Sequence, residues 1–84
     1  MNILIVTTPG HDTAAVKDIV AEYPETKVIN FYTTNMEELA IIAKNRILPV
    51  DSVLVFDGSK AVARIVGRAF ALKTVRATVD LLKQ

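Results

Sequence analysis

The sequence predicts one α/β domain over residues 1–84, in the order β-α-β-α-β-β-α, with a four-stranded mixed sheet and helices on both faces. Short apolar runs rich in β-branched residues alternate with longer segments of helical periodicity. The last two apolar runs are separated by an Asp-Gly turn, which predicts an antiparallel hairpin. A chain of 84 residues has the length of one domain, so we expect a single hydrophobic core region.

The N-terminal segment predicts a buried strand, a turn and a helix. Residues 2–7 form a nearly continuous apolar run, which is typical of a strand covered on both faces. Pro9-Gly10 ends this strand, and Asp12 or Thr13 can accept hydrogen bonds at the start of a helix over 12–23. A helix that begins at the end of a strand places positive partial charge there, so we take this turn as the first candidate site.

The middle of the chain predicts a second strand and a second helix. Residues 27–32 form the strand, which we expect to run parallel to the first because a helix joins them. The following turn contains two possible capping boxes, Thr34 with Glu37 or Asn35 with Glu38. The helix is expected to pack one apolar stripe on the sheet, widened by two further isoleucines. The stripe is Met36, Leu39, Ala40, Ala43 and Ile47, and the additional residues are Ile41 and Ile42.

The C-terminal part predicts a hairpin and a final helix. Strands over 53–56 and 61–66 flank the turn, and Arg64 indicates the exposed face of an edge strand. The helix over 69–83 is expected to turn Leu72, Val75, Val79 and Leu82 inward. On its outer face, the i,i+4 spacing of Arg76 and Asp80 favours an ion pair within the helix.

The composition excludes several classes of chemistry. Hydrophobic residues make up 51% and charged residues 23% of the chain, which fits a compact domain rather than a disordered one. There is no cysteine, so no disulfide, zinc-thiolate site or thiol chemistry is possible, and one histidine is too few for an ordinary metal site. No apolar run approaches the ~20 residues of a membrane span, and no signal peptide is recognisable, so we expect a cytoplasmic location.

The strand and turn Thr7-Thr8-Pro9-Gly10, within this order of elements, resemble the thioredoxin-like fold of the glutaredoxin type over nearly the whole chain. In that family the same segment precedes a Cys-x-x-Cys motif. The resemblance therefore implies that His11 stands at the attacking cysteine and Ala14 at the resolving one. It also implies a degenerate member of the family, because both thiols are missing.

A second segment, Ile47 to Gly58, resembles the part of thioredoxins that holds the cis-proline and the next strand. Matching on Phe56 puts Asp51 at the cis-proline position and Ser52 at the following threonine, whereas Pro49 falls two residues early. Gly67-Arg68-Ala69-Phe70 does not reproduce the turn with which glutaredoxins hold glutathione. We therefore expect neither glutathione nor any other cofactor, and no metal.

The leading hypothesis is a redox-inactive domain that binds another protein or an extended peptide. Thiol-disulfide exchange needs a thiolate, which this chain lacks. The family's docking groove can nevertheless persist without the cysteines. The residues that we expect to form the binding surface are Thr8, Pro9, Gly10, His11, Asp12, Val50, Asp51 and Ser52.

Two alternatives remain open from the sequence. The first is an enzyme of altered, non-thiol chemistry, in which Asp51 orients His11 beside hydroxyl groups; the simpler interpretation leaves both as solvated loop residues. The second is a small nucleic-acid-binding or host-directed accessory protein, because residues 43–84 carry eight basic and three acidic side chains. An ordinary solvated surface explains the same charges. The basic candidates are Lys44, Arg46, Arg64, Arg68, Lys73, Arg76 and Lys83.

Overall fold

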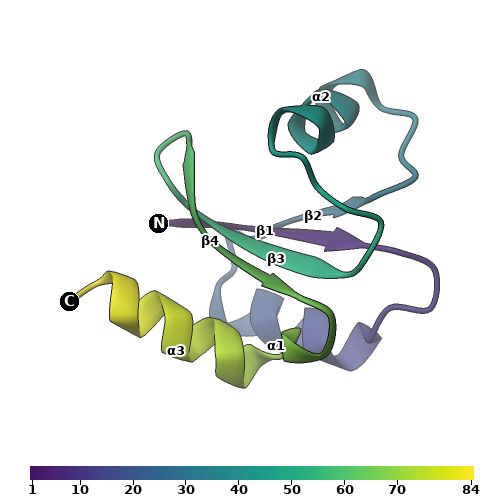
Figure 1. The fold of residues 1–84 in the computed structure, drawn as a ribbon. Coiled ribbons are helices and arrows are strands. Elements are labelled where there is room, and N and C mark those ends of the chain that lie inside the picture. The colour runs from purple at the N-terminus through teal and green to yellow at the C-terminus, as the bar shows by residue number, and fades with distance from the viewer.

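A computed structural model describes all of residues 1–84 (Figure 1). Four strands and three α-helices follow in the predicted order, with a short 3-10 turn, η1, before the last helix. The elements are β1 (Asn2–Thr7), α1 (Thr13–Glu22), β2 (Lys27–Asn30), α2 (Met36–Lys44), β3 (Ser52–Asp57), β4 (Lys60–Val66), η1 (Gly67–Ala69) and α3 (Leu72–Leu82).

The four strands form one mixed sheet in the order β2-β1-β3-β4. Strand β1 pairs in parallel with β2, because α1 returns the chain to the end of the sheet where β1 begins. On its other side, β1 pairs antiparallel with β3. Strands β3 and β4 form the predicted antiparallel hairpin, with a register shift at Val55/Phe56. The predicted fold class, a four-stranded mixed sheet with helices on both faces, is confirmed.

The sheet separates two hydrophobic clusters, because alternate side chains of a strand point to opposite faces. Helices α1 and α3 lie on one face and α2 lies on the other (Figure 1). The larger cluster joins Ile3 and Ile5 of β1 to Ile19 of α1 and Val75 of α3. The smaller cluster contains Leu4, Val6, Ile29, Ile47 and Leu54.

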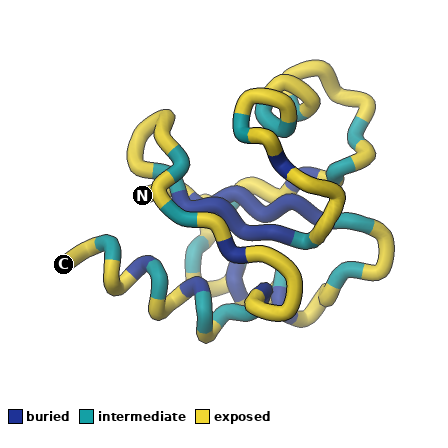
Figure 2. The backbone as a smooth tube through the Cα atoms, viewed as in Figure 1, coloured by how far each residue is buried: buried dark blue, intermediate teal, exposed yellow.

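The second helix differs from its prediction. Four residues of the expected inward stripe, Met36, Leu39, Ala40 and Ala43, face solvent, and only its last residue turns inward. Ile41 and Ile42 are instead turned toward the smaller cluster, although no residue of α2 itself is buried. Ile47, which lies beyond the end of the helix, is buried. Exposed residues accordingly dominate the α2 tube in Figure 2. The helix sequence contains two overlapping apolar faces, the predicted stripe and the pair Ile41 and Ile42. The second face packs on the sheet, next to the buried Ile47.

Arg64 of β4 fastens the end of α2 from across the sheet. Its guanidinium donates hydrogen bonds to the backbone carbonyls of Asn45 and Arg46, which follow the last turn of the helix. Arg46 has a positive φ of 52°, the left-handed conformation that commonly ends a helix. Arg64 is exposed, as predicted for an edge strand, and also caps a helix C-terminus that carries negative partial charge.

The salt bridge expected within α3 is not formed. Arg76 pairs with Glu22 of α1 rather than with Asp80, donating from Nε to Oε2 at 2.7 Å and from Nη2 to Oε1 at 2.5 Å. The two helices lie side by side on one face of the sheet, so the planar guanidinium meets a carboxylate from the neighbouring helix. Hydrogen bonding from Arg76 lowers the pKa of Glu22 below its ordinary value.

This pairing predicts a pH-dependent stability. A lowered pKa in the folded state means that the Glu22 carboxylate stabilises the fold above its unfolded pKa, and that this contribution is lost as the pH falls through the folded-state pKa. We expect Glu22→Gln to lower the melting temperature at pH 7 and to match the unmodified protein at about pH 2.5–3. Thermal denaturation at both pH values checks this, with Glu25→Gln, an exposed glutamate outside the helices, as the control. An equal deficit at both pH values would contradict it.

Candidate functional site

The turn after β1 and the loop before β3 meet at one edge of the sheet. Val6 pairs with Ser52, so the chain that leaves β1 passes beside the chain that enters β3. The end of β4 reaches the same edge, because Ser52 also pairs with Val66. The structure thus brings together the two segments, around Thr8 and around Asp51, that the sequence analysis assigned to one site.

Asp51 connects three segments at this edge. Its Oδ1 accepts one hydrogen bond from the Thr8 backbone N–H and another from the Thr8 hydroxyl, both at 2.8 Å. Its backbone carbonyl accepts a hydrogen bond from the Gly67 N–H at 3.1 Å. Hydrogen bonds to a carboxylate are stronger than those between neutral groups. We call this arrangement the Asp51 clamp, and it holds the loops after β1 and β4 against the loop before β3.

His11 lies near the clamp but does not join it. Its Nδ1 is 3.2 Å from the Thr8 carbonyl oxygen, which also accepts from the His11 backbone N–H at 3.2 Å. A carbonyl can only accept, so Nδ1 carries the proton in this contact. No hydrogen bond or ion pair joins His11 to Asp51. The Asp51 carboxylate is engaged by Thr8 through Oδ1 and not by the imidazole.

The helix start at this edge is defined by Asp12. Its Oδ1 accepts from the Ala15 N–H at 3.0 Å, which makes Asp12 the N-cap of α1, one of the two predicted caps. Pro9 and Gly10 form the exposed tip of the turn. Gly10 has a φ of 81°, a conformation that other residues rarely adopt, so this tip depends on glycine.

Ser52 does not belong to the exposed surface, which corrects its place in the predicted binding surface. It is only 2% exposed, and its hydroxyl has no hydrogen-bond partner. Ser52 is the first residue of β3 and pairs with Val6 of β1 and Val66 of β4, so it belongs to the sheet rather than to the exposed loop before it.

The loop before Asp51 exposes apolar side chains, one of which lies outside the predicted binding surface. The Val50 N–H donates to the Leu48 carbonyl at 2.8 Å, which closes a tight turn around Pro49. The chain has no cis peptide bond, so neither Pro49 nor Asp51 reproduces a cis-proline. Leu48 is 61% exposed, and Val50 and Val66 are exposed beside the same clamp. The predicted binding surface did not include Leu48 or Val66. For Leu48 the sequence does contain a signal, because a residue immediately before a proline favours extended backbone.

The predicted basic residues do not form one surface. Lys44 and Arg46 lie on the α2 side of the sheet, whereas Lys73 and Lys83 lie on or beside α3, which covers the opposite face. Arg64 and Arg76 are engaged within the chain. No group of three or more histidine or acidic side chains could hold a metal ion.

Comparison of the structure with solved structures finds a match to the crystal structure of thioredoxin O2 from Arabidopsis thaliana in the oxidized state. The TM-score is 0.62 at 15% sequence identity, over 99% of this chain and 75% of the other. The fold is thioredoxin-like. No protein-family model matches the sequence, and no curated protein matches it either. None of the helices in this thioredoxin-like domain has the length and hydrophobicity that a membrane span requires.

The Asp51 clamp predicts a measurable loss of stability on truncation. Asp51→Ala leaves the Thr8 N–H and hydroxyl without a charged acceptor, so we expect a loss of about 1–3 kcal/mol in the free energy of unfolding. Asp51→Asn retains an acceptor and should lose less. Urea denaturation measures both against Asp18→Ala, an exposed aspartate of α1. A loss from Asp51→Ala no larger than the control's would show that the clamp does not stabilise the fold.

Removal of the buried Ser52 hydroxyl is expected to have the opposite effect on the free energy of unfolding. Removing an unpaired buried polar group relieves a desolvation cost, so Ser52→Ala should leave stability unchanged or raise it by up to about 1 kcal/mol. The same urea experiment tests this expectation. A clear loss would reveal a hydrogen bond of Ser52 in solution.

Proposed function

We propose that the protein is a redox-inactive thioredoxin-like module that binds another protein through the edge described above. We define the binding edge by its accessible parts, which are Thr8–Asp12, Leu48–Asp51 and Val66. The proposal places the former redox position inside a docking surface, with His11 where the resemblance puts the attacking cysteine.

The absence of thiols supports the redox-inactive part. Exchange with a disulfide proceeds through attack by a thiolate and a mixed disulfide, and this chain contains no cysteine. An imidazole at His11 and a methyl group at Ala14 cannot replace the two sulfur atoms. The clamp between Thr8 and Asp51 keeps the surrounding loops in a defined arrangement without any disulfide.

The observation that carries the binding part is the exposure of Leu48, Val50 and Val66 beside the clamp. Apolar side chains that gather at one exposed site are a common feature of protein interfaces. Their backbone is held by the Asp51 clamp and by the turn around Pro49, so little order must be gained on binding.

The hydrogen bonds of the loop indicate how a partner is held. The Val50 N–H is already used by Leu48, so a bound segment cannot pair with it as an added strand would. Binding is therefore expected to depend on apolar side-chain contacts, with Pro9 and Gly10 allowing close approach on the other side of the clamp. The hydrogen bonds of Thr8 and His11 do not favour the alternative of an enzyme. The Thr8 hydroxyl donates to Asp51, and the only hydrogen-bond partner of the His11 imidazole is the Thr8 carbonyl, so the imidazole is not placed to activate that hydroxyl.

A pair of matched substitutions tests the binding edge. Leu48→Asp places a charge on the edge, whereas Leu81→Asp places the same charge on α3 at a residue that is 69% exposed, close to the exposure of Leu48. Both residues are exposed, so both variants should fold. The purified protein, immobilised, is exposed to cell extract, and the retained proteins are quantified by mass spectrometry.

We expect the unmodified chain and Leu81→Asp to retain at least one protein in similar amounts. Leu48→Asp should retain about tenfold less of that protein or none, because burying an unpaired charge at an interface is costly. Equal retention by the two variants, or retention of nothing above the bare matrix, would contradict the proposal.

Redox inactivity has its own test. The cysteine-free protein should not accelerate the reduction of insulin disulfides by dithiothreitol above the uncatalysed rate, with or without glutathione. A thioredoxin run in parallel provides the positive control. Turnover by this chain would refute the redox-inactive part and leave the binding part to be judged by the retention experiment.

A further inference from the structure

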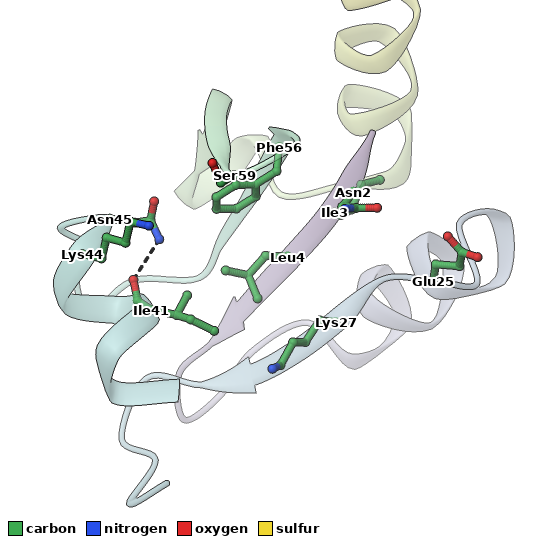
Figure 3. A pocket seen from close by; sticks show the side chains of 10 residues that line it. All are labelled: Asn2, Ile3, Leu4, Glu25, Lys27, Ile41, Lys44, Asn45, Phe56 and Ser59. Carbon is green, nitrogen blue, oxygen red and sulfur yellow. Dashed lines mark hydrogen bonds between the residues drawn. The ribbon is translucent and has the colours of Figure 1, made fainter. Parts of the chain in front are cut away.

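A concave site lies away from the binding edge, at the other end of β1. Its cavity volume is about 510 Å³, within the ~300–1,000 Å³ of small-molecule pockets. It touches Asn2, Ile3 and Leu4, whereas the binding edge follows the last residue of β1. Figure 3 shows the residues around it, which come from β1, β2, α2 and the β3–β4 hairpin. We call it the α2 groove.

The groove exists because α2 covers its face of the sheet incompletely. The helix has nine residues, none of them buried. It packs on the sheet through the half-buried Ile41 and Ile42, and the chain beyond its C-terminal end is held by Ile47 and the Arg64 hydrogen bonds. Leu4 of β1, Ile41 of α2 and Phe56 of β3 surround the open space (Figure 3). Leu4 is buried, and the other two are only half-buried, so apolar surface remains for a ligand to cover.

The charges around these apolar side chains are predominantly positive. Lys27 of β2 and Lys44 of α2 line the groove, and neither ammonium group forms a salt bridge or a hydrogen bond within the chain. Lys27 extends from β2 toward the α2 side of the view, whereas Glu25, the one acidic lining residue, lies apart from the apolar side chains (Figure 3).

The uncharged polar residues that line the groove are Asn45, Asn2 and Ser59. Asn45 donates from Nδ2 to the Ile41 carbonyl at 2.9 Å, which leaves its side-chain oxygen without a partner in the chain. The groove therefore combines an apolar interior with two unpaired cations, which matches an alkyl chain that ends in an anion.

We propose that the α2 groove binds a small amphipathic anion, an alkyl carboxylate of about eight to ten carbons. The alkyl chain lies against Leu4, Ile41 and Phe56, and the carboxylate is held at the rim by Lys27 or by Lys44, which lie on opposite sides of the groove (Figure 3). This site goes beyond the proposed function, because it shares no residue with the binding edge.

The experiment titrates the full chain with octanoate and decanoate below their micelle concentrations and follows the Leu4 and Ile41 methyl signals by NMR. We expect saturable shifts of both signals, with decanoate binding up to about fifteenfold more tightly than octanoate, because each of its two additional methylenes contributes about fourfold when buried. Octanol and octyltrimethylammonium, which have the same chain with a neutral or positive head, should bind more weakly than octanoate.

Two double variants of equal charge test the lysines. Lys27→Gln with Lys44→Gln removes both groove cations, whereas Lys17→Gln with Lys73→Gln removes two exposed cations from α1 and α3 on the opposite face. Because all four lysines are exposed, neither double variant should unfold the protein. We expect the groove variant to weaken decanoate binding at least about threefold and the control variant to leave it unchanged.

Three results would overturn the proposal. Decanoate could leave the Leu4 and Ile41 signals unshifted. Octyltrimethylammonium could bind as tightly as octanoate, which would show a groove with no preference for anions. The two double variants could lose affinity equally, which would make the effect one of net charge. A failure of the binding-edge experiment has no bearing on any of these results.

Discussion

The structure depends on the burial of β1 and β3 on both of their faces. Ile3 and Ile5 point into one hydrophobic cluster, and Leu4 and Val6 point into the other. Burial of one such side chain contributes roughly 1.5–3 kcal/mol, so neither face of the sheet can be left in water. Two helices cover the first face, but α2 alone covers the second. That unequal coverage explains both the smaller second cluster and the groove beside it.

The Asp51 clamp has a structural consequence for a thioredoxin-like domain without cysteines. The turn after β1 and the loop before β3 are separated by more than forty residues, and the carboxylate joins them through two short hydrogen bonds to Thr8. The Gly67 N–H, which follows the end of β4, donates a hydrogen bond to the backbone carbonyl of Asp51. Three loops therefore keep a defined arrangement by hydrogen bonding alone. A defined edge can thus exist without thiol chemistry, and the apolar side chains exposed beside it are the basis for proposing a docking surface.

The two proposed sites lie at opposite ends of β1 and are held by different interactions. The binding edge is positioned by Asp51, whereas the groove is shaped by the attachment of α2 through Ile47 and Arg64. Their chemistry also differs. The edge offers apolar side chains around a carboxylate that is already hydrogen-bonded, and the groove combines an apolar interior with the unpaired ammonium groups of Lys27 and Lys44. Both sites can therefore be occupied at the same time without competing for a residue.

The sequence by itself determined the features that depend on neighbouring residues. The apolar run of β1, the Asp-Gly hairpin and the alternating order of elements predicted the fold class, and the caps Asp12 and Asn35 are among the residues that it suggested. The proximity of Thr8 to Asp51 was also expected, although only through the resemblance to the thioredoxin-like family. Turn chemistry, capping and hydrophobic periodicity act within about one turn of helix or a few strand residues, so one sequence is sufficient to recognise them.

Only the tertiary structure decided which partners these elements meet. Periodicity could not choose between the two apolar faces of α2, because the choice depends on Ile47 and on Arg64 from a distant strand. Arg76 had Asp80 within reach along its own helix, yet the neighbouring α1 presents Glu22 in a better geometry. Ser52 is buried as the first residue of a central strand, whereas the sequence placed it in an exposed loop. Pairing, burial and the use of the Asp51 carboxylate by Thr8 rather than His11 are set by contacts between distant segments, which a local pattern does not encode.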